Sequence, residues 1–446
     1  MSSEIDSMFG DMPKGVTEDM TLSELRRLRF EELKAQRNVR LSDVYKTYDK
    51  WLCIKDRGRI DVVLAAALTR RLTGTPIWLF LVGPSGDGKS EQLMALNEPE
   101  NTVIIHEITP STLVSGMSTD KQNLDLAPKL KDKVVLIPDM AALLNMHPND
   151  KLKLWGQLRE LYDGRAGKTT GISDAKYSGI RVTLLACSTP SIDAQTTIFN
   201  SLGTRELHFR TYEGDHEKVM QKVLENEKAE EQMREELQEV TQSFLRYTLI
   251  KDMEWPENVK NCVIGLIDYL RYMRAGADKD SGTGELRADV HPEQPTRVLK
   301  QMRRLYVALK SLDDGYTDEQ AVNVLHHIVV SSINPNRRRV LECFEDEGDK
   351  ISQYIVANRC KIGVKTAYGE LGVLWNMGLL NKQIEENVDR PWQHTEYWFL
   401  SQKGKEIRGK IIPSLNNSKG NIPLPIFSEE KKGGEICGTR PDKQGQ

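Results

Sequence analysis

The sequence predicts an α/β fold in which a mostly parallel sheet carries helices on both faces. Short runs rich in valine, isoleucine and leucine alternate with helical stretches between Ile77 and Arg210, as in sheets that are buried on both sides. The first of these runs is followed at once by a glycine-rich loop and a helical segment. The predicted strands are residues 77–82, 102–106, 133–138, 181–187 and 206–209.

The glycine-rich loop has the spacing of a phosphate-binding loop, or P-loop. It reads Gly83-Pro84-Ser85-Gly86-Asp87-Gly88-Lys89-Ser90 and matches G-x-x-x-x-G-K-[ST] without a gap. In such a loop the glycines let backbone N–H groups turn towards the β-phosphate, and the helix that follows adds its dipole. The lysine adds a charge and the serine hydroxyl can ligate Mg²⁺. Because strand, loop and helix occur together, we expect ATP or GTP with Mg²⁺, and assign ATP, rather than a chance glycine-rich turn.

A P-loop enzyme also needs an acid that holds Mg²⁺, expected at the end of a strand beside the P-loop strand. The strand at 133–138 ends at Asp139, which fits this role better than that of an ordinary turn residue. Met140 follows, where many such ATPases have a glutamate that polarises the attacking water. Hydrolysis then needs another base or is slow. Glu107, at the end of the neighbouring strand, is the candidate, and Glu160 is a weaker one.

Two later segments carry polar side chains that could read the state of the nucleotide. Ser188 and Thr189 end the fourth strand and could touch the γ-phosphate or the water, although termination of the strand by polar turn residues explains them equally well. Arg205, after Gly203 and Thr204, is well placed to be an arginine finger that acts on a neighbouring subunit's nucleotide. The competing interpretation is that Arg205 is an ordinary surface arginine without a catalytic role.

This ordered set of motifs resembles an AAA+ ATPase, over about residues 45–400. The segments 113–116 and 156–165 are similar to uncharacterised AAA+ proteins of archaea, bacteria and their viruses, which are distantly similar to the ATPase cores of minichromosome maintenance helicases. The resemblance implies a helical lid after the α/β core, with a sensor arginine that opens a lid helix and contacts the γ-phosphate. Arg297 matches that position. Met140 and the Ser188-Thr189 pair depart from the family pattern, which has glutamate and asparagine there.

A β-hairpin is predicted between Arg165 and Arg181, from two short polar strands around residues 172–174. In helicase relatives such a hairpin projects into the pore of a ring and touches DNA. Lys168 and Lys176 are then its phosphate contacts. A surface loop with ordinary lysines is the competing interpretation.

The segment 336–405 is predicted to contain three helices followed by two strands around a polar turn, and it resembles a winged-helix domain. Its third helix, from about residue 364 to 378, is the candidate recognition helix, with Lys361 and Lys365 near its start as DNA contacts. The three arginines at 337–339 also favour DNA. Several acidic residues accompany them, and winged helices also serve as docking modules for proteins.

Bulk composition limits the alternatives. The 446 residues hold 62 lysines and arginines against 65 aspartates and glutamates, so a grip on nucleic acid must come from local basic patches. Six scattered cysteines without a Cys-x-x-Cys motif favour reduced thiols over a structural zinc site. The polar start of the chain and the lack of any membrane-length apolar run lead us to expect a soluble cytoplasmic protein without membrane partners.

The sequence therefore predicts five parts: an N-terminal tail and helical lead-in (1–44), a nucleotide-binding core (45–212), a helical connector and lid (213–335), a winged-helix domain (336–405) and a disordered tail (406–446). The leading hypothesis is a ring-forming ATPase, a homo-oligomer and most simply a hexamer, that works on DNA as a helicase, initiator or loader. The alternative is a regulatory or remodelling ATP switch whose winged helix recruits a protein.

Overall fold

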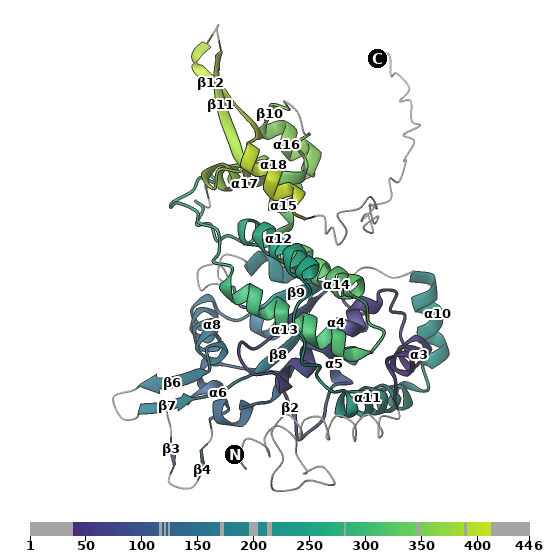
Figure 1. Cartoon of the computed structure of the whole chain (residues 1–446). Helices are drawn as coiled ribbons and strands as arrows, with labels where there is room; N and C mark the ends of the chain where they lie inside the picture. The colour runs from purple at the N-terminus through teal and green to yellow at the C-terminus, as the bar shows by residue number, and fades with distance from the viewer. Residues whose placement is uncertain are drawn as a thin grey trace, which may run out of the picture.

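The computed structural model describes residues 39–411 apart from 116–117, 120–121, 124, 170–173, 196–203, 212–215, 281, 346–348 and 388–389. Figure 1 shows an α/β core, a layer of helices above it and a C-terminal unit at the top. Of the predicted N-terminal segment at 1–44 and the predicted tail at 406–446, residues 1–38 and 412–446 lie outside the described residues. No helix among the described residues combines the length and apolar character that crossing a bilayer requires.

The core is built on a five-stranded parallel sheet, as predicted. Its strands are β1 (Trp78–Val82), β2 (Thr102–Ile104), β5 (Val134–Ile137), β8 (Thr183–Ser188) and β9 (Leu207–Arg210). Each lies within two residues of its predicted ends. The order across the sheet is β2-β5-β8-β1-β9. The expectation that the strand before Asp139 lies beside the P-loop strand is therefore wrong, because β8 lies between β5 and β1.

Helices cover both faces of this sheet because side chains alternate along each strand. Leu79 and Leu81 of β1 belong to one buried cluster, and Trp78, Phe80 and Val82 to another. The first cluster contains α4 (Arg57–Leu68) and Leu93 of α5 (Lys89–Met94), and the second contains α6 (Pro110–Leu113), α7 (Ala141–Leu144) and α8 (Pro148–Tyr162). Ten of the twelve residues of α4 are buried, as expected for a helix that is apolar on nearly every side. Three 3₁₀ helices, η1 (Thr69–Arg71), η2 (Ala127–Leu130) and η3 (Pro190–Gln195), join these elements.

The predicted boundary between lead-in and core falls inside a helix. Helix α3 (Leu41–Trp51) packs against α11 (Glu230–Tyr247), and the Tyr48 and Thr241 hydroxyls lie 3.0 Å apart in the buried contact. Phe244 of α11 is also buried in the core. Much of the predicted connector is thus part of the core. The helix before α11, α10 (His216–Asn226), is exposed.

Three helices form the layer above the sheet: α12 (Glu257–Met273), α13 (Thr296–Leu312) and α14 (Asp318–Ser331). Helix α13 packs on α4, and the end of α14 lies along the outer strand β9. The side-chain hydroxyls of Ser331 and Ser332 accept hydrogen bonds from the backbone N–H groups of Arg210 and His208, both at 2.9 Å. The layer therefore closes the side of β9 that has no neighbouring strand.

Two hairpins project from the core on the same side (Figure 1). The predicted hairpin is present as β6 (Arg165–Thr169) and β7 (Asp174–Ser178). The second hairpin, β3 (Ser118–Thr119) with β4 (Gln122–Asn123), was not predicted. The two regions are tied together because the Asp125 carboxylate accepts hydrogen bonds from Ser115 and from the Tyr177 hydroxyl.

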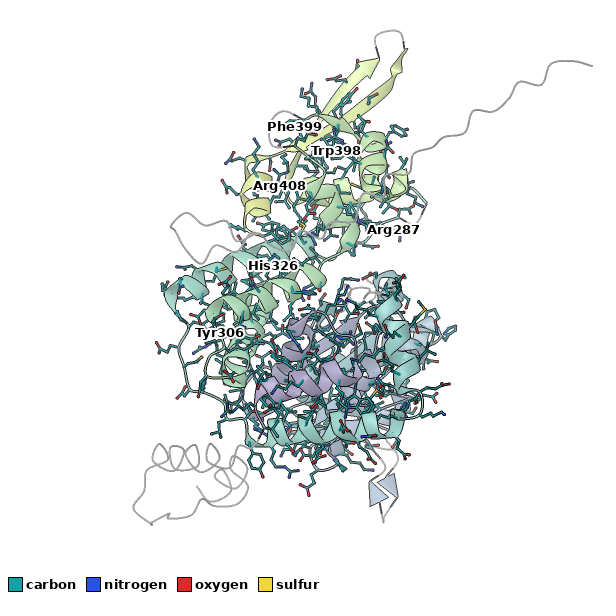
Figure 2. The ribbon with its side chains drawn as sticks, turned by 90° about the vertical axis from the view of Figure 1, so that its right-hand side faces the viewer. Arg287, Tyr306, His326, Trp398, Phe399 and Arg408 are labelled. Carbon is teal, nitrogen blue, oxygen red and sulfur yellow. The ribbon has the colours of Figure 1, made fainter. Side chains whose placement is uncertain are left out.

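The C-terminal unit has the elements predicted for it. Helices α15 (Pro335–Glu342), α16 (Gln353–Cys360) and α17 (Val364–Asn376) pack with a three-stranded antiparallel sheet of β10 (Ile351–Ser352), β11 (Leu380–Asn387) and β12 (Arg390–Leu400). Figure 2 shows Trp398 and Phe399 in this unit, above Tyr306 and His326 of the helical layer. Trp398 is buried and meets Trp375 edge to face. A last helix, α18 (Gln402–Gly409), runs past the predicted boundary at 405.

Candidate nucleotide site and a second basic pocket

The P-loop leaves the carboxyl end of β1, where strand, loop and α5 follow one another as the sequence predicts. Gly86 and Gly88 have φ values of 81° and 76°, a left-handed backbone that glycine adopts without strain. Gly83 is needed for a different reason: a Cβ there would lie 1.7 Å from the Thr211 hydroxyl. The loop is thus held in shape by glycines at three places.

Lys89 is turned back onto its own loop. Its ammonium donates to the Gly83 carbonyl at 2.9 Å, the Pro84 carbonyl at 2.5 Å and the Asp87 carboxylate at 2.7 Å. The side chain is only 7% exposed. An ammonium at this place can reach a phosphate seated on the loop by changing these partners.

Ser90 and Asp139, the two residues predicted to hold Mg²⁺, come together. The Ser90 hydroxyl donates to the Pro138 carbonyl at 2.9 Å, and Asp139 is the next residue. The Asp139 carboxylate is exposed and accepts a hydrogen bond from the Ala141 N–H at 2.8 Å. A serine hydroxyl beside an exposed carboxylate is a donor set that suits Mg²⁺, which keeps several waters when it binds. Among the described residues, no cluster of three or more histidine, cysteine or acidic side chains could hold a metal by itself.

The positions considered for activating water, 140 and 107, are less favourably placed for their predicted role. Met140 is 1% exposed and packs in the apolar cluster on one face of the sheet, so position 140 faces the core rather than the loop. Glu107 is exposed beyond the end of β2, which pairs with β5 as predicted. Two strands, β5 and β8, separate β2 from the P-loop strand. Glu107 therefore lies at the correct edge of the sheet but near its far side.

Ser188 is the better placed of the two predicted sensor residues. It ends β8, opposite Val82 of β1, and its carbonyl accepts the Gly83 N–H at 3.1 Å. Its own hydroxyl is turned to the Thr189 carbonyl at 3.1 Å. Thr189 is exposed and lies 2.7 Å from the Ser191 hydroxyl. The structure thus brings Ser188, rather than Thr189, directly against the P-loop.

A buried polar network beneath the loop was missed by sequence reasoning. Asp87 receives the Thr211 hydroxyl and lies 3.6 Å from the guanidinium of Arg59. Arg59 also donates to the Gln92 side chain at 2.8 Å, and burial lowers its pKa. The available signal was Arg59 directly before the apolar segment 60–68, because a buried cation requires a partner.

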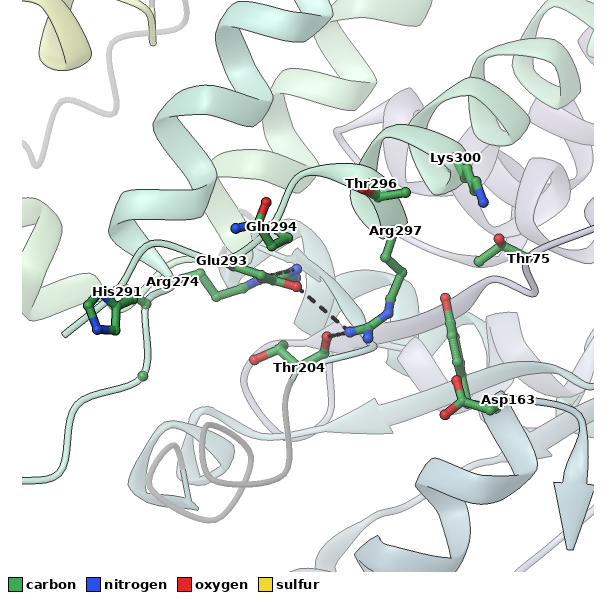
Figure 3. Close-up of a pocket in the computed structure, with 13 residues that line it drawn as sticks. Thr75, Asp163, Thr204, Arg274, His291, Glu293, Gln294, Thr296, Arg297 and Lys300 are labelled. Atoms are coloured by element: carbon green, nitrogen blue, oxygen red, sulfur yellow. Dashed lines mark hydrogen bonds and ion pairs between the residues drawn. The ribbon is translucent and has the colours of Figure 1, made fainter. Parts of the chain in front are cut away.

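The two predicted arginines, Arg205 and Arg297, lie together in a second place, where Figure 3 shows Arg297. Arg205 pairs with Asp163 at 3.0 Å, and Arg297 donates to the Thr204 carbonyl at 2.8 Å. Both guanidiniums lie within 6 Å of the Tyr162 ring. Arg297 lines a pocket of about 590 Å³, and Arg205 pairs with Asp163 of its lining. Its lining includes Thr75, Asp163, Thr204, Arg274, His291, Glu293, Gln294, Thr296, Arg297 and Lys300.

This basic pocket does not adjoin the P-loop of the same chain. Arg205 precedes β9, whereas the P-loop follows β1, and the two strands run parallel with Leu79 opposite Leu207. Arg205 and Arg297 therefore lie at the amino edge of the sheet and the P-loop at its carboxyl edge. The expectation that Arg297 reaches the γ-phosphate from the lid does not hold within one chain.

The predicted DNA contacts occupy varied settings. Lys168 of β6 donates to the Ser115 carbonyl at 3.1 Å, and Lys176 of β7 is exposed. Lys361 is exposed in a left-handed conformation at the end of α16, and Lys365 is exposed in the first turn of α17. Arg337, one of the three arginines taken to favour the DNA motor, is 2% exposed and pairs with Glu370 at 2.9 Å, so it is a structural residue.

Residues 275–294, here called the strap, cover one face of α17. Lys279 of the strap pairs with Glu370 at 2.6 Å, and Asn376 bonds to the backbone N–H of Val290 at 2.7 Å. A Cβ on Gly369 would lie 3.2 Å from the strap's Gly284 carbonyl. This face of the predicted recognition helix is thus in contact with the chain itself.

Arginine, lysine and carboxylate partners thus gather at two edges of one sheet, a P-loop with Ser90 and Asp139 at one and the basic pocket at the other. No protein-family model matches the chain, and no curated protein is significantly similar to it.

Proposed function

We propose that the chain is an ATP-binding and ATP-hydrolysing protein of the AAA+ type, whose catalytic site is completed by a neighbouring copy. The observation that carries this proposal is the meeting of Lys89, Ser90 and Asp139 around a complete P-loop. In the proposed mechanism Lys89 would neutralise phosphate charge, and Ser90 and Asp139 would hold the Mg²⁺ that accompanies the nucleotide. Ser188, against the loop, orients the attacking water.

The basic pocket supports the role of a second copy. Arg205 and Arg297 lie at the edge of the sheet opposite to the P-loop, so they can serve phosphates only on another molecule. A ring that sets the amino edge of one sheet against the carboxyl edge of the next brings both guanidiniums to a neighbouring γ-phosphate. Positive charge there stabilises the transition state of phosphoryl transfer. A hexamer is the ring size that we propose.

DNA is the proposed substrate of the motor. Two hairpins project side by side from the core, with Lys168 and Lys176 on the longer one, and the C-terminal unit is proposed to be a winged helix. Lys361 and Lys365 lie exposed beside its third helix. Lysines placed in this way neutralise phosphates without reading sequence.

The test is the rate of ATP hydrolysis by the full chain, alone and with single-stranded or double-stranded DNA. We expect Mg²⁺-dependent turnover that DNA stimulates and that Lys89→Ala abolishes together with binding of a fluorescent ATP analogue. Sizing with a non-hydrolysable analogue should show a ring. Unchanged nucleotide affinity in Lys89→Ala would refute the nucleotide site itself.

A switch without motor activity is the second candidate, and three observations favour it. Met140 is buried where a catalytic glutamate is common, Arg337 is engaged within the protein, and the strap covers a face of α17. In this case ATP controls assembly and the C-terminal unit binds a protein. Glu107 then has no catalytic part, and the rate of hydrolysis is slow and does not respond to DNA.

A further inference from the structure

Asp87 stands at the centre of the charges beneath the P-loop. Its Oδ1 accepts the Lys89 ammonium at 2.7 Å, and its Oδ2 accepts the Thr211 hydroxyl and lies 3.6 Å from Arg59. The Asp87 side chain is 12% exposed and that of Arg59 is 6% exposed. Because donors surround this carboxylate, it is held in one position, and it in turn holds the conformation of the P-loop.

The Lys89 ammonium has no N–H donor left for a further hydrogen bond in this arrangement. An ammonium carries three N–H donors. All three directions are used, towards Gly83, Pro84 and Asp87. A phosphate oxygen can therefore accept from Lys89 only after one of these bonds is given up, and the charged one to Asp87 is the strongest of them.

The partners of Asp87 allow this exchange without stranding a buried charge. When Lys89 turns to a phosphate, Arg59 and Thr211 remain beside the carboxylate. Arg59 is itself anchored from the far side, since its Nε donates to Gln92 and the Gln92 amide donates to the Arg59 carbonyl at 3.0 Å. Leaving a buried carboxylate with no cation would be much more costly.

We propose that Asp87 is a positioning residue that holds Lys89 in a resting state and thereby sets the affinity for nucleotide. This inference rests on the proposed function, because it assumes that the P-loop receives a triphosphate. The Asp87 charge competes with the phosphates for Lys89 and repels them at short range. Removing that charge while keeping the shape should favour the bound state.

The experiment compares Asp87→Asn with a matched control, Glu91→Gln. Glu91 lies on the same helix two residues after Lys89, but its carboxylate pairs with Arg234 at 3.0 Å. We expect Asp87→Asn to bind a fluorescent ATP analogue on the order of tenfold more tightly. KM should fall with kcat nearly unchanged, since binding in ground and transition states improves alike. Glu91→Gln should leave both unchanged.

A second readout needs no nucleotide. In the free protein, the rate at which an amine-reactive acylating reagent modifies Lys89, followed by mass spectrometry, should rise in Asp87→Asn and stay the same in Glu91→Gln. An unchanged or weaker affinity together with an unchanged rate of modification would overturn the role of Asp87. Should the wild-type chain bind no nucleotide, the proposed function fails, while the modification rates still judge the contact between Asp87 and Lys89.

Loss of the carboxylate also leaves Arg59 without its anion, which destabilises the fold. The effect of the Asp87 charge on affinity is therefore measured again in a protein that lacks Arg59. Arg59→Met and the double variant Arg59→Met/Asp87→Asn differ by the same single charge at position 87. The double variant should bind the analogue more tightly than Arg59→Met. If the two bind equally, the Asp87 charge does not set the affinity.

Discussion

Asp61 joins three parts of the molecule through one carboxyl group. It lies in α4 and is 4% exposed, and it accepts hydrogen bonds from the Tyr45 hydroxyl at 2.5 Å and the Tyr316 hydroxyl at 2.7 Å. Tyr45 belongs to α3 and Tyr316 to the turn before α14. Burial raises the pKa of Asp61 to about 6, and the two hydroxyls only partly offset it.

Stability should depend on pH through this group. The folded-state pKa of about 6 lies above the ordinary 3.8, so the folded protein favours the protonated form. That contribution is complete below pH 3.8 and is lost as the pH rises through 6, for a total of about 3 kcal/mol. Chemical denaturation of wild type and Asp61→Asn at pH 4 and pH 7 should show wild type losing about 2 kcal/mol relative to the variant, since the unfolded carboxyl is already partly ionised at pH 4.

Tyr316→Phe is the companion variant, because it removes one hydroxyl that lowers the pKa of Asp61. Its loss of stability between pH 4 and pH 7 should be larger than in wild type. If Asp61→Asn and wild type change with pH in parallel, the carboxyl group does not titrate in this range.

Some of these residues could be predicted and others could not. Lys89, Ser90 and Asp139 were predicted because their chemistry follows from motif and strand end. Arg59 and Thr211 were missed because each acts through Asp87, and their contact depends on three segments distant in sequence. Arg337 was counted in favour of a DNA motor because a run of arginines does not reveal which of them is buried.

At the scale of elements, the junction between α15, α17 and the strap is held by a buried charge cluster. Arg337 donates to Glu370 and to the carbonyls of Met273 and Ala275 at the end of α12. Burial alone would raise the pKa of Glu370, but Arg337 and Lys279 outweigh it and hold that pKa below its usual value. The C-terminal unit is thereby fixed to the helical layer.

Arg337→Met should loosen this junction. It leaves Glu370 buried with one cation fewer, a change that costs about 3 kcal/mol or more. Hydrogen exchange should accelerate in α15, α17 and the strap. The neighbouring Arg338→Met removes an exposed pair with Glu342, worth about 1 kcal/mol at most, and should leave exchange in α17 unchanged. Equal effects of the two variants would contradict the structural role of Arg337.

Most of the strands were predictable because they are apolar runs, as burial on both faces requires, whereas the outer strand β9 alternates apolar and polar residues. Their order was not, since it depends on how the crossover connections pass over the sheet. This is why β8, rather than the strand before Asp139, was found beside β1. The contact between the strap and α17 was equally hidden, because glycine and polar residues in a loop do not specify the surface on which it lies.

For the molecule as a whole, our proposal makes the two edges of the sheet complementary halves of one catalytic site. If copies combine as we propose, Lys89→Ala and Arg297→Ala each lack a different half of the shared catalytic site. Each variant should hydrolyse ATP poorly alone, and an equal mixture should regain part of the activity, at interfaces that pair an intact P-loop with an intact Arg297. Arg297 is preferred to Arg205 because its side chain is 32% exposed, against 6% for Arg205. A mixture no more active than its components would contradict a shared site.

The Ser331 and Ser332 hydroxyls that cap β9 also prevent another strand from pairing with it. An open strand with unpaired N–H groups is a template for aggregation, and Ser331 and Ser332 occupy the groups of Arg210 and His208 that would otherwise serve. The double variant Ser331→Ala/Ser332→Ala should scatter more light on incubation at raised temperature, while Thr47→Ala, whose hydroxyl bonds within its own helix, should not. With these N–H groups occupied, one copy of the chain cannot lengthen the sheet of another at β9.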